Sequence, residues 1–101
     1  MAVVLAEFVD PIAYEGVAYR AQACGAQVGH LWEGWIEFIP VHGGPAVRSA
    51  RETTQPNFGD TQYWANGLTR VYLEGALNRA MNPIVRVPST ASQPMFDGPD
   101  R

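Results

Sequence analysis

The clearest pattern along the chain is the alternation of large apolar and polar side chains between residues 31 and 39. A strand with this period of two carries different side chains on its two faces: on one face Trp32, Ile36 and Phe38, and on the other Glu33, Trp35 and Glu37. The segment is rich in aromatic and β-branched residues, which favour strands. We therefore expect a central strand, with Phe38 facing a hydrophobic core and Trp35 facing away from it.

Shorter segments predict a strand on either side of the central one and a further edge strand near the N-terminus. Residues 17–24 alternate with period two, and the glycine-containing segment 24–30 that follows is expected to be a loop. Residues 46–53 alternate poorly and carry several charges, which is typical of an edge strand that is protected against further pairing. The apolar run 1–9 stops at an Asp-Pro turn signal and predicts a docked edge strand, whereas residues 12–15 fit no element clearly.

Two helix start signals follow the strands. Asn57 and Thr69 are suitable N-cap residues, because their side-chain oxygens can accept hydrogen bonds from the free amides of a first helical turn. Gly67 suits the end of the first helix, and Asn82-Pro83 stops the second. The spacing predicts helices over 58–66 and 70–81. Residues at i, i+3, i+4, i+7 and i+8 form the apolar stripe of the second helix: Leu73, Ala76, Leu77, Ala80 and Met81.

Together these elements predict an α+β fold, in which a three-stranded antiparallel sheet packs on a C-terminal helical segment of two short helices. A chain of 101 residues suits one domain, which we place at 1–87 with its folded unit at about 14–81. Residues 84–87 are apolar enough to add a short strand. Residues 88–101 combine proline with small and polar residues and predict a flexible tail.

Composition and charge narrow the classes of partner. The net charge of −3 argues against a general nucleic-acid coat, which needs clustered cations. All seven basic residues are arginine, which reflects either genomic base composition or selection for bidentate anion contacts. One cysteine allows no internal disulfide, and neither a signal peptide nor an apolar stretch of about 20 residues is present. We therefore expect a cytoplasmic protein that does not bind membranes.

Candidate metal and catalytic groups are few. Cys24, His30 and His42 do not have the spacing of zinc ligands, so we expect no metal and no cofactor. Glu33 and Glu37 would lie roughly 13 Å apart along a strand, too far to share a proton. None of the familiar catalytic sequence motifs occurs, and the sequence favours a non-enzymatic role.

Trp35 is the most informative candidate for an interaction site. Tryptophan on the outer face of a strand is typical of interface anchors, and Glu33 and Glu37 would form its polar rim. Alternatively, the N-terminal run or the tail covers the ring, or the ring stacks on a small ligand. Arg48 and Arg51 have opposite parity, so a regular strand cannot place both beside Trp35. We expect them to pair with these glutamates across strands, or with the same face of a second copy.

The order of elements, three strands and then a helix, resembles that of AP2-type DNA-binding domains and of double-stranded-RNA-type modules without their first helix. The segments 31–38, 51–57 and 71–77 are also similar to those of small bacterial proteins that have no assigned function. This resemblance covers about residues 14–81 and implies no site residues.

Three hypotheses for function remain open at this point. The favoured one is a non-enzymatic protein-interaction module, homodimeric or hetero-complexed, that uses either the tail or the face with Trp35, Glu33, Glu37, Arg48 and Arg51. The second is a small enzyme or ligand-binding domain with a pocket between sheet and helices, for which the candidates are Cys24, His30, Tyr63 and Trp64. The third is a nucleic-acid-associated domain of AP2-like topology, which the acidic charge disfavours.

Overall fold

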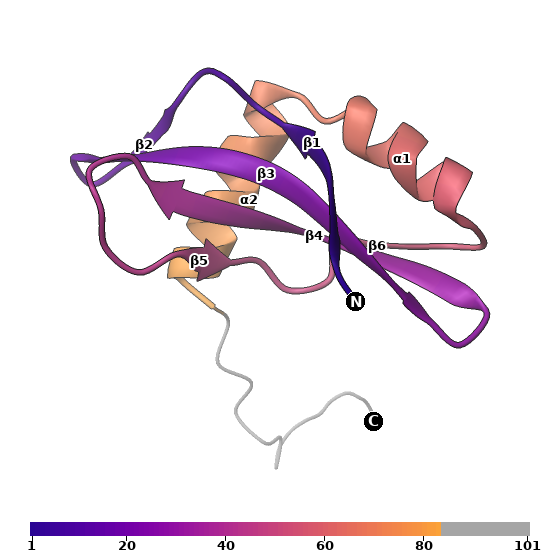
Figure 1. Ribbon diagram of the computed structural model, residues 1–101. Helices are drawn as coiled ribbons and strands as arrows, with labels where there is room; N and C mark the ends of the chain where they lie inside the picture. The colour runs from indigo at the N-terminus through magenta and orange to yellow at the C-terminus, as the bar shows by residue number, and fades with distance from the viewer. Residues whose placement is uncertain (84–101) are drawn as a thin grey trace, which may run out of the picture.

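The computed structural model describes residues 1–83 and is built on one antiparallel sheet with two helices packed against it (Figure 1). The strands are β1 (Val3–Glu7), β2 (Ile12–Tyr14), β3 (Val17–Val28), β4 (Leu31–Pro40), β5 (Val47–Arg48) and β6 (Thr53–Gln55), and the helices are α1 (Phe58–Asn66) and α2 (Arg70–Met81). The α+β class is confirmed, but the sheet has six strands and not three. The predictions for 84–87 and for the tail 88–101 lie outside the described residues.

The long hairpin of β3 and β4 forms the centre of the sheet. Its register runs without interruption from Tyr19 opposite Pro40 to Val28 opposite Leu31. The prediction of a loop over 24–30 is therefore wrong, because β3 continues to Val28. The error came from taking Gly25 as a sign of a loop. This residue lies inside the strand, where a Cβ atom would lie 3.0 Å from a Leu5 methyl carbon. It is glycine because the sheet is crowded at this point, and it makes no turn.

Short strands flank the hairpin on both sides. β1 and β2 pair with β3, and β5 and β6 pair with β4. The predicted edge strand at the N-terminus is confirmed as β1, and β2 lies in the segment that fitted no element. The predicted strand 46–53 is interrupted, because the Ser49 hydroxyl oxygen accepts the hydrogen bond of the Ile36 amide at 3.0 Å. A side chain thereby takes the place of a backbone partner, and the chain leaves the ladder between β5 and β6.

Both helices have the bounds that the sequence predicts, and both predicted N-caps are confirmed. Asn57 Oδ1 accepts from the Asp60 amide at 2.8 Å, and Thr69 Oγ1 accepts from the Tyr72 amide at 3.2 Å. Gly67 ends α1 with a φ of −93°, a value open to any residue, so its conformation does not require glycine.

The helices bury one face of the hairpin and leave the other without a helix. Ile36 and Phe38 of β4 form the core with Leu73 and Leu77 of α2, as predicted. Trp32 was expected in the same cluster, but its ring is only partly buried and lies edge-on against Phe58, with ring centroids 5.1 Å apart. The difference arises because α1 covers this end of β4, and α2 covers the other.

Candidate interaction site on the helix-free face of the sheet

The face of the sheet that carries no helix displays the side chains that alternate with the core positions. We call this surface the helix-free face, and its central residues are Gln22, Cys24, Glu33, Trp35, Glu37 and Arg48. Cross-strand pairing places Cys24 beside Trp35, and Glu37 between Gln22 and Arg48. Polar and apolar side chains are therefore interleaved on two central strands.

Trp35 faces away from the helices, as the period of two predicts, but it is not a solvated anchor. Its exposed fraction is 5%, because neighbours on the same face cover it. The Arg48 guanidinium carbon lies 4.0 Å from the centroid of the Trp35 ring, in a cation–π contact. The indole Nε1–H donates to Glu37 Oε2 at 3.1 Å. The interpretation of Trp35 as an exposed interface anchor is therefore wrong, and the alternative that the ring is covered within its own chain holds, with Arg48 and Glu37 in contact with it.

Glu37 connects the polar groups of this face. One carboxylate oxygen accepts from Trp35, and the other accepts from Gln22 Nε2 at 3.2 Å. Burial raises the pKa of the neighbouring Cys24 thiol to about 11, and the Glu37 carboxylate adds to the rise. The thiol is therefore less acidic than an ordinary cysteine, which lowers the fraction of reactive thiolate at neutral pH.

Arg51 completes the set of five residues that the sequence proposes for an interface. Its guanidinium lies 3.5 Å from the Glu33 carboxylate, which confirms the expected cross-strand pairing of an arginine with a glutamate on this face. The parity argument, which separated Arg48 from Arg51 on a regular strand, does not apply here, because residues 49–52 lie outside the strands β5 and β6. All five residues therefore gather on the helix-free face, where Arg51 is ion-paired with Glu33, Arg48 is stacked on Trp35 and Glu37 accepts from Trp35.

The four residues proposed for a ligand pocket do not meet. Cys24 is buried on the helix-free face, and His30 is exposed in the turn between β3 and β4. Tyr63 is 81% exposed on α1. Trp64 covers Gly34 on the opposite side of the sheet. Among residues 1–83, no three His, Cys, Asp or Glu side chains are grouped in a way that could hold a metal ion.

Sequence analysis missed two contributors to the helix-free face, Gln22 and three exposed apolar residues of β1, β3 and β4. Gln22 lies on the polar face of a predicted strand, but its contact with Glu37 depends on a register that the sequence does not reveal. Val4, Val28 and Leu31 project from the same face and remain between 47% and 52% exposed. Val4 lies next to Cys24, and Val28 and Leu31 lie at the turn end of the hairpin, so accessible apolar surface extends from the covered tryptophan toward that end.

The chain matches no protein-family model, no curated protein and no solved structure in the comparisons that we made. Within the described part of the chain, neither helix has the length and apolar character that a membrane span needs.

Proposed function

We propose that the protein is a non-enzymatic interaction module that self-associates through the helix-free face. The observation that carries this proposal is the placement of both helices on the other side of the sheet, which leaves the second face of two long strands without a helix over it. Val4, Val28 and Leu31 are exposed there beside a rigid cluster of tryptophan, arginine and carboxylate side chains. Aromatic and arginine side chains are enriched in protein interfaces, and rigid ones lose little entropy on binding.

The charges of this face favour a second copy of the chain as the partner. Glu33 is beside Arg51, and Glu37 is paired across strands with Arg48, so both signs alternate over a short distance. In a two-fold symmetric contact, the same patch meets itself, and each arginine can face a carboxylate of the partner. A face of one sign would repel its own copy, and this face does not have that obstacle.

Exposed residues test this proposal better than Trp35, whose removal would open a cavity in the monomer. We expect the wild type to sediment as a concentration-dependent dimer and Leu31→Glu to weaken association by about 2 kcal/mol or more, the scale of an interface hot spot. Val71→Glu is the matched control, because Val71 is exposed on α2 and the change in charge is the same. A wild type that stays monomeric at every concentration, or equal weakening by both variants, would refute the proposal.

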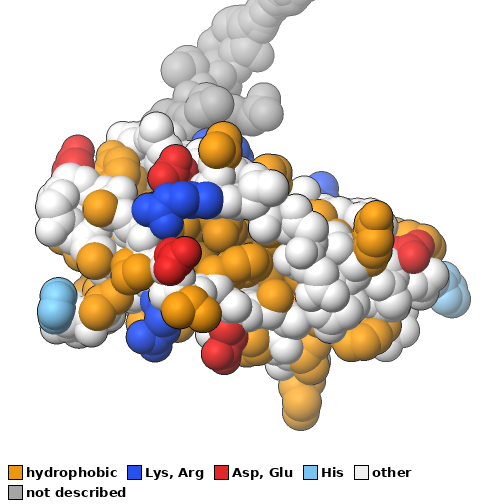
Figure 2. Space-filling model, turned by 90° about the horizontal axis from the view of Figure 1, so that it is seen from above, with side chains coloured by type: hydrophobic (Ala, Val, Ile, Leu, Met, Phe, Trp, Pro, Cys, Tyr) orange, Lys and Arg blue, Asp and Glu red, His pale blue; other side chains and the backbone are white. Residues whose placement is uncertain are grey.

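Nucleic-acid binding is the less favoured alternative. Arg51 lies beside Glu33, and Arg48 lies across from Glu37, so the negative charges of both glutamates oppose the binding of phosphate on this face. Figure 2 shows basic and acidic side chains interspersed with apolar ones over another face of the molecule, without a continuous basic patch. Strong, salt-dependent retention on heparin would favour the alternative.

A further inference from the structure

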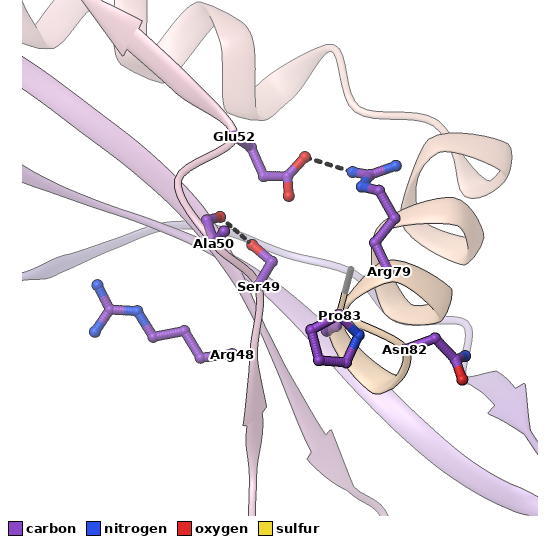
Figure 3. A pocket seen from close by; sticks show the side chains of 8 residues that line it. Arg48, Ser49, Ala50, Glu52, Arg79, Asn82 and Pro83 are labelled. Carbon is purple, nitrogen blue, oxygen red and sulfur yellow. Dashed lines mark hydrogen bonds and ion pairs between the residues drawn. The ribbon is translucent and has the colours of Figure 1, made fainter. Parts of the chain in front are cut away.

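A cavity of about 350 Å³ opens between the segment that follows β5 and the last turn of α2 (Figure 3). Its wall includes Ser49, Glu52, Arg79, Ala80, Asn82 and Pro83. The volume lies near the lower end of the range for small-molecule sites. The residues proposed for a pocket from the sequence are not among those that line it.

Glu52 has a largely buried side chain that borders this cavity, and the donors among residues 1–83 reach only one of its two carboxylate oxygens. Its side chain is 8% exposed. Oε1 accepts from the Tyr72 hydroxyl at 2.5 Å and from Arg79 Nη2 at 2.6 Å. Within residues 1–83, Oε2 accepts no hydrogen bond. Each carboxylate oxygen can accept two, and a buried charged acceptor without a donor is costly, so the site favours an incoming donor.

The end of α2 adds negative potential to the same cavity. Pro83 has no N–H, so it cannot supply the i+4 hydrogen bond to the carbonyl of Arg79. Unsatisfied carbonyls carry the negative end of the helix dipole and attract cations. Ser49 does not provide a free donor, because its hydroxyl already donates to the Ala50 carbonyl at 2.7 Å.

Neither of the two arginines near the cavity is bound to Glu52 Oε2, so this oxygen can accept from another cation. Arg79 is bound to Oε1, and its charge is offset by that of Glu52. Arg48 lines the rim, but its guanidinium is stacked on Trp35 and points away from the cavity (Figure 3). The acceptors that remain at the cavity include Glu52 Oε2 and the carbonyl groups at the end of α2, which carry negative charge or partial negative charge.

We infer that this cavity binds a guanidinium group, carried by a small molecule or by an arginine side chain of another protein, with Glu52 Oε2 as its main acceptor. A guanidinium suits the site better than an ammonium, because it is planar, presents several N–H donors and is more weakly hydrated, so it enters a half-closed cavity at lower cost. The site lies on the α2 side of the sheet edge, and the inference does not depend on self-association through the helix-free face.

The test is an NMR titration of the ¹⁵N-labelled full chain with N-acetylarginine amide. N-acetylcitrulline amide is the matched control ligand, because it has nearly the same shape and no charge. We expect saturable shifts of the Tyr72, Arg79 and Asn82 amides with the arginine ligand, and at least tenfold weaker binding of the citrulline ligand. No saturable shift of these amides up to about 10 mM, or equal binding of the two ligands, would overturn the inference.

Two variants test the assignment to the cavity. Glu52→Gln keeps the shape and removes the charge, and it should weaken binding at least tenfold, whereas Glu74→Gln, on the exposed surface of α2, should leave it unchanged. Because Glu52 also holds Arg79 and Tyr72, its variant can disturb folding. Ala80→Leu is the second test, since it narrows the cavity and leaves Glu52 in place. Unchanged binding by Ala80→Leu, or by a folded Glu52→Gln, would overturn the inference.

A third titration separates the two sources of guanidinium. Ethylguanidinium that binds as tightly as an Ala-Arg-Ala peptide with blocked ends indicates a small-molecule ligand. Tighter binding of the peptide indicates an arginine side chain of a protein. Either result supports the guanidinium site, and failure of both ligands to bind overturns it.

Discussion

Gly34 allows α1 to lie close to β4, and replacing it tests how tightly this contact is packed. A Cβ atom at this position would lie 2.6 Å from Trp64 Cζ3 and 2.9 Å from the methyl carbon of Thr53, well inside van der Waals distance. Overpacking of a core costs about 1–3 kcal/mol. Replacing glycine with alanine also stabilises the folded state by about 0.5–1 kcal/mol, because glycine in a strand loses more conformational entropy on folding than alanine does. We therefore expect Gly34→Ala to lower the free energy of unfolding by about 1–2 kcal/mol.

The assay is urea denaturation followed by far-ultraviolet circular dichroism. The expected loss corresponds to a fall in Tm of about 4–16 °C for a domain of this size. Gly75→Ala is the matched control on α2, because the new Cβ atom would lie 3.5 Å from Arg79 Nη1, an ordinary contact distance. Alanine favours a helix interior, so this variant should be as stable as the wild type or slightly more stable.

A double-mutant cycle identifies the clashing group. Trp64→Leu removes the ring atoms that meet the new methyl group, so Gly34→Ala should cost at least about 0.5 kcal/mol less in that background. Part of the cost should persist, because the Thr53 methyl group remains. An equal cost in both backgrounds, or no measurable cost in the wild type, would show that α1 does not depend on glycine at this position.

Three further outcomes follow from single residues. Phe38→Ala, which empties a fully buried site, should lower the free energy of unfolding by about 3–5 kcal/mol in urea, and a loss below 1 kcal/mol would contradict the assignment of β4 faces. The pKa of Cys24 is raised from 9.0 to about 11, so the unfolded thiol loses its proton first and stability should fall between pH 9 and 11. The free energy of unfolding of Cys24→Ala should fall less over that pH range. Parallel curves of stability against pH for the wild type and the variant would contradict the pKa shift. The pKa of Tyr72 is raised by burial and then by Glu52, so Glu52→Gln should lower it in an ultraviolet titration, with Tyr72→Phe identifying the signal.

The sequence by itself determined the elements whose signals are local. Asn57 and Thr69 mark both helix starts, because an N-cap needs only its own side chain and the amides two or three residues later. The alternation along β4 likewise determined which side chains face the core, since a strand reverses face at every residue. These features involve neighbours in the chain, and they hold in the structure.

Only the tertiary structure decided the features that depend on register and on contacts between distant segments. Glycine is typical of loops, but Gly25 lies in a strand, because the Leu5 side chain occupies the space that a side chain at this position would fill. Ser49 interrupts a ladder by bonding to Ile36, which brings Arg48 and Arg51 to one face.

The same limit applies to both candidate sites. Whether Trp35 is exposed depends on Arg48, and the sequence shows only that it faces away from the core. The cavity beside Glu52 depends on residues from the sheet edge and from α2, which the chain brings together across 27 positions. Local patterns determine the direction of a side chain, but burial and hydrogen-bond partners are set by residues far apart in sequence, which only the folded chain places in contact.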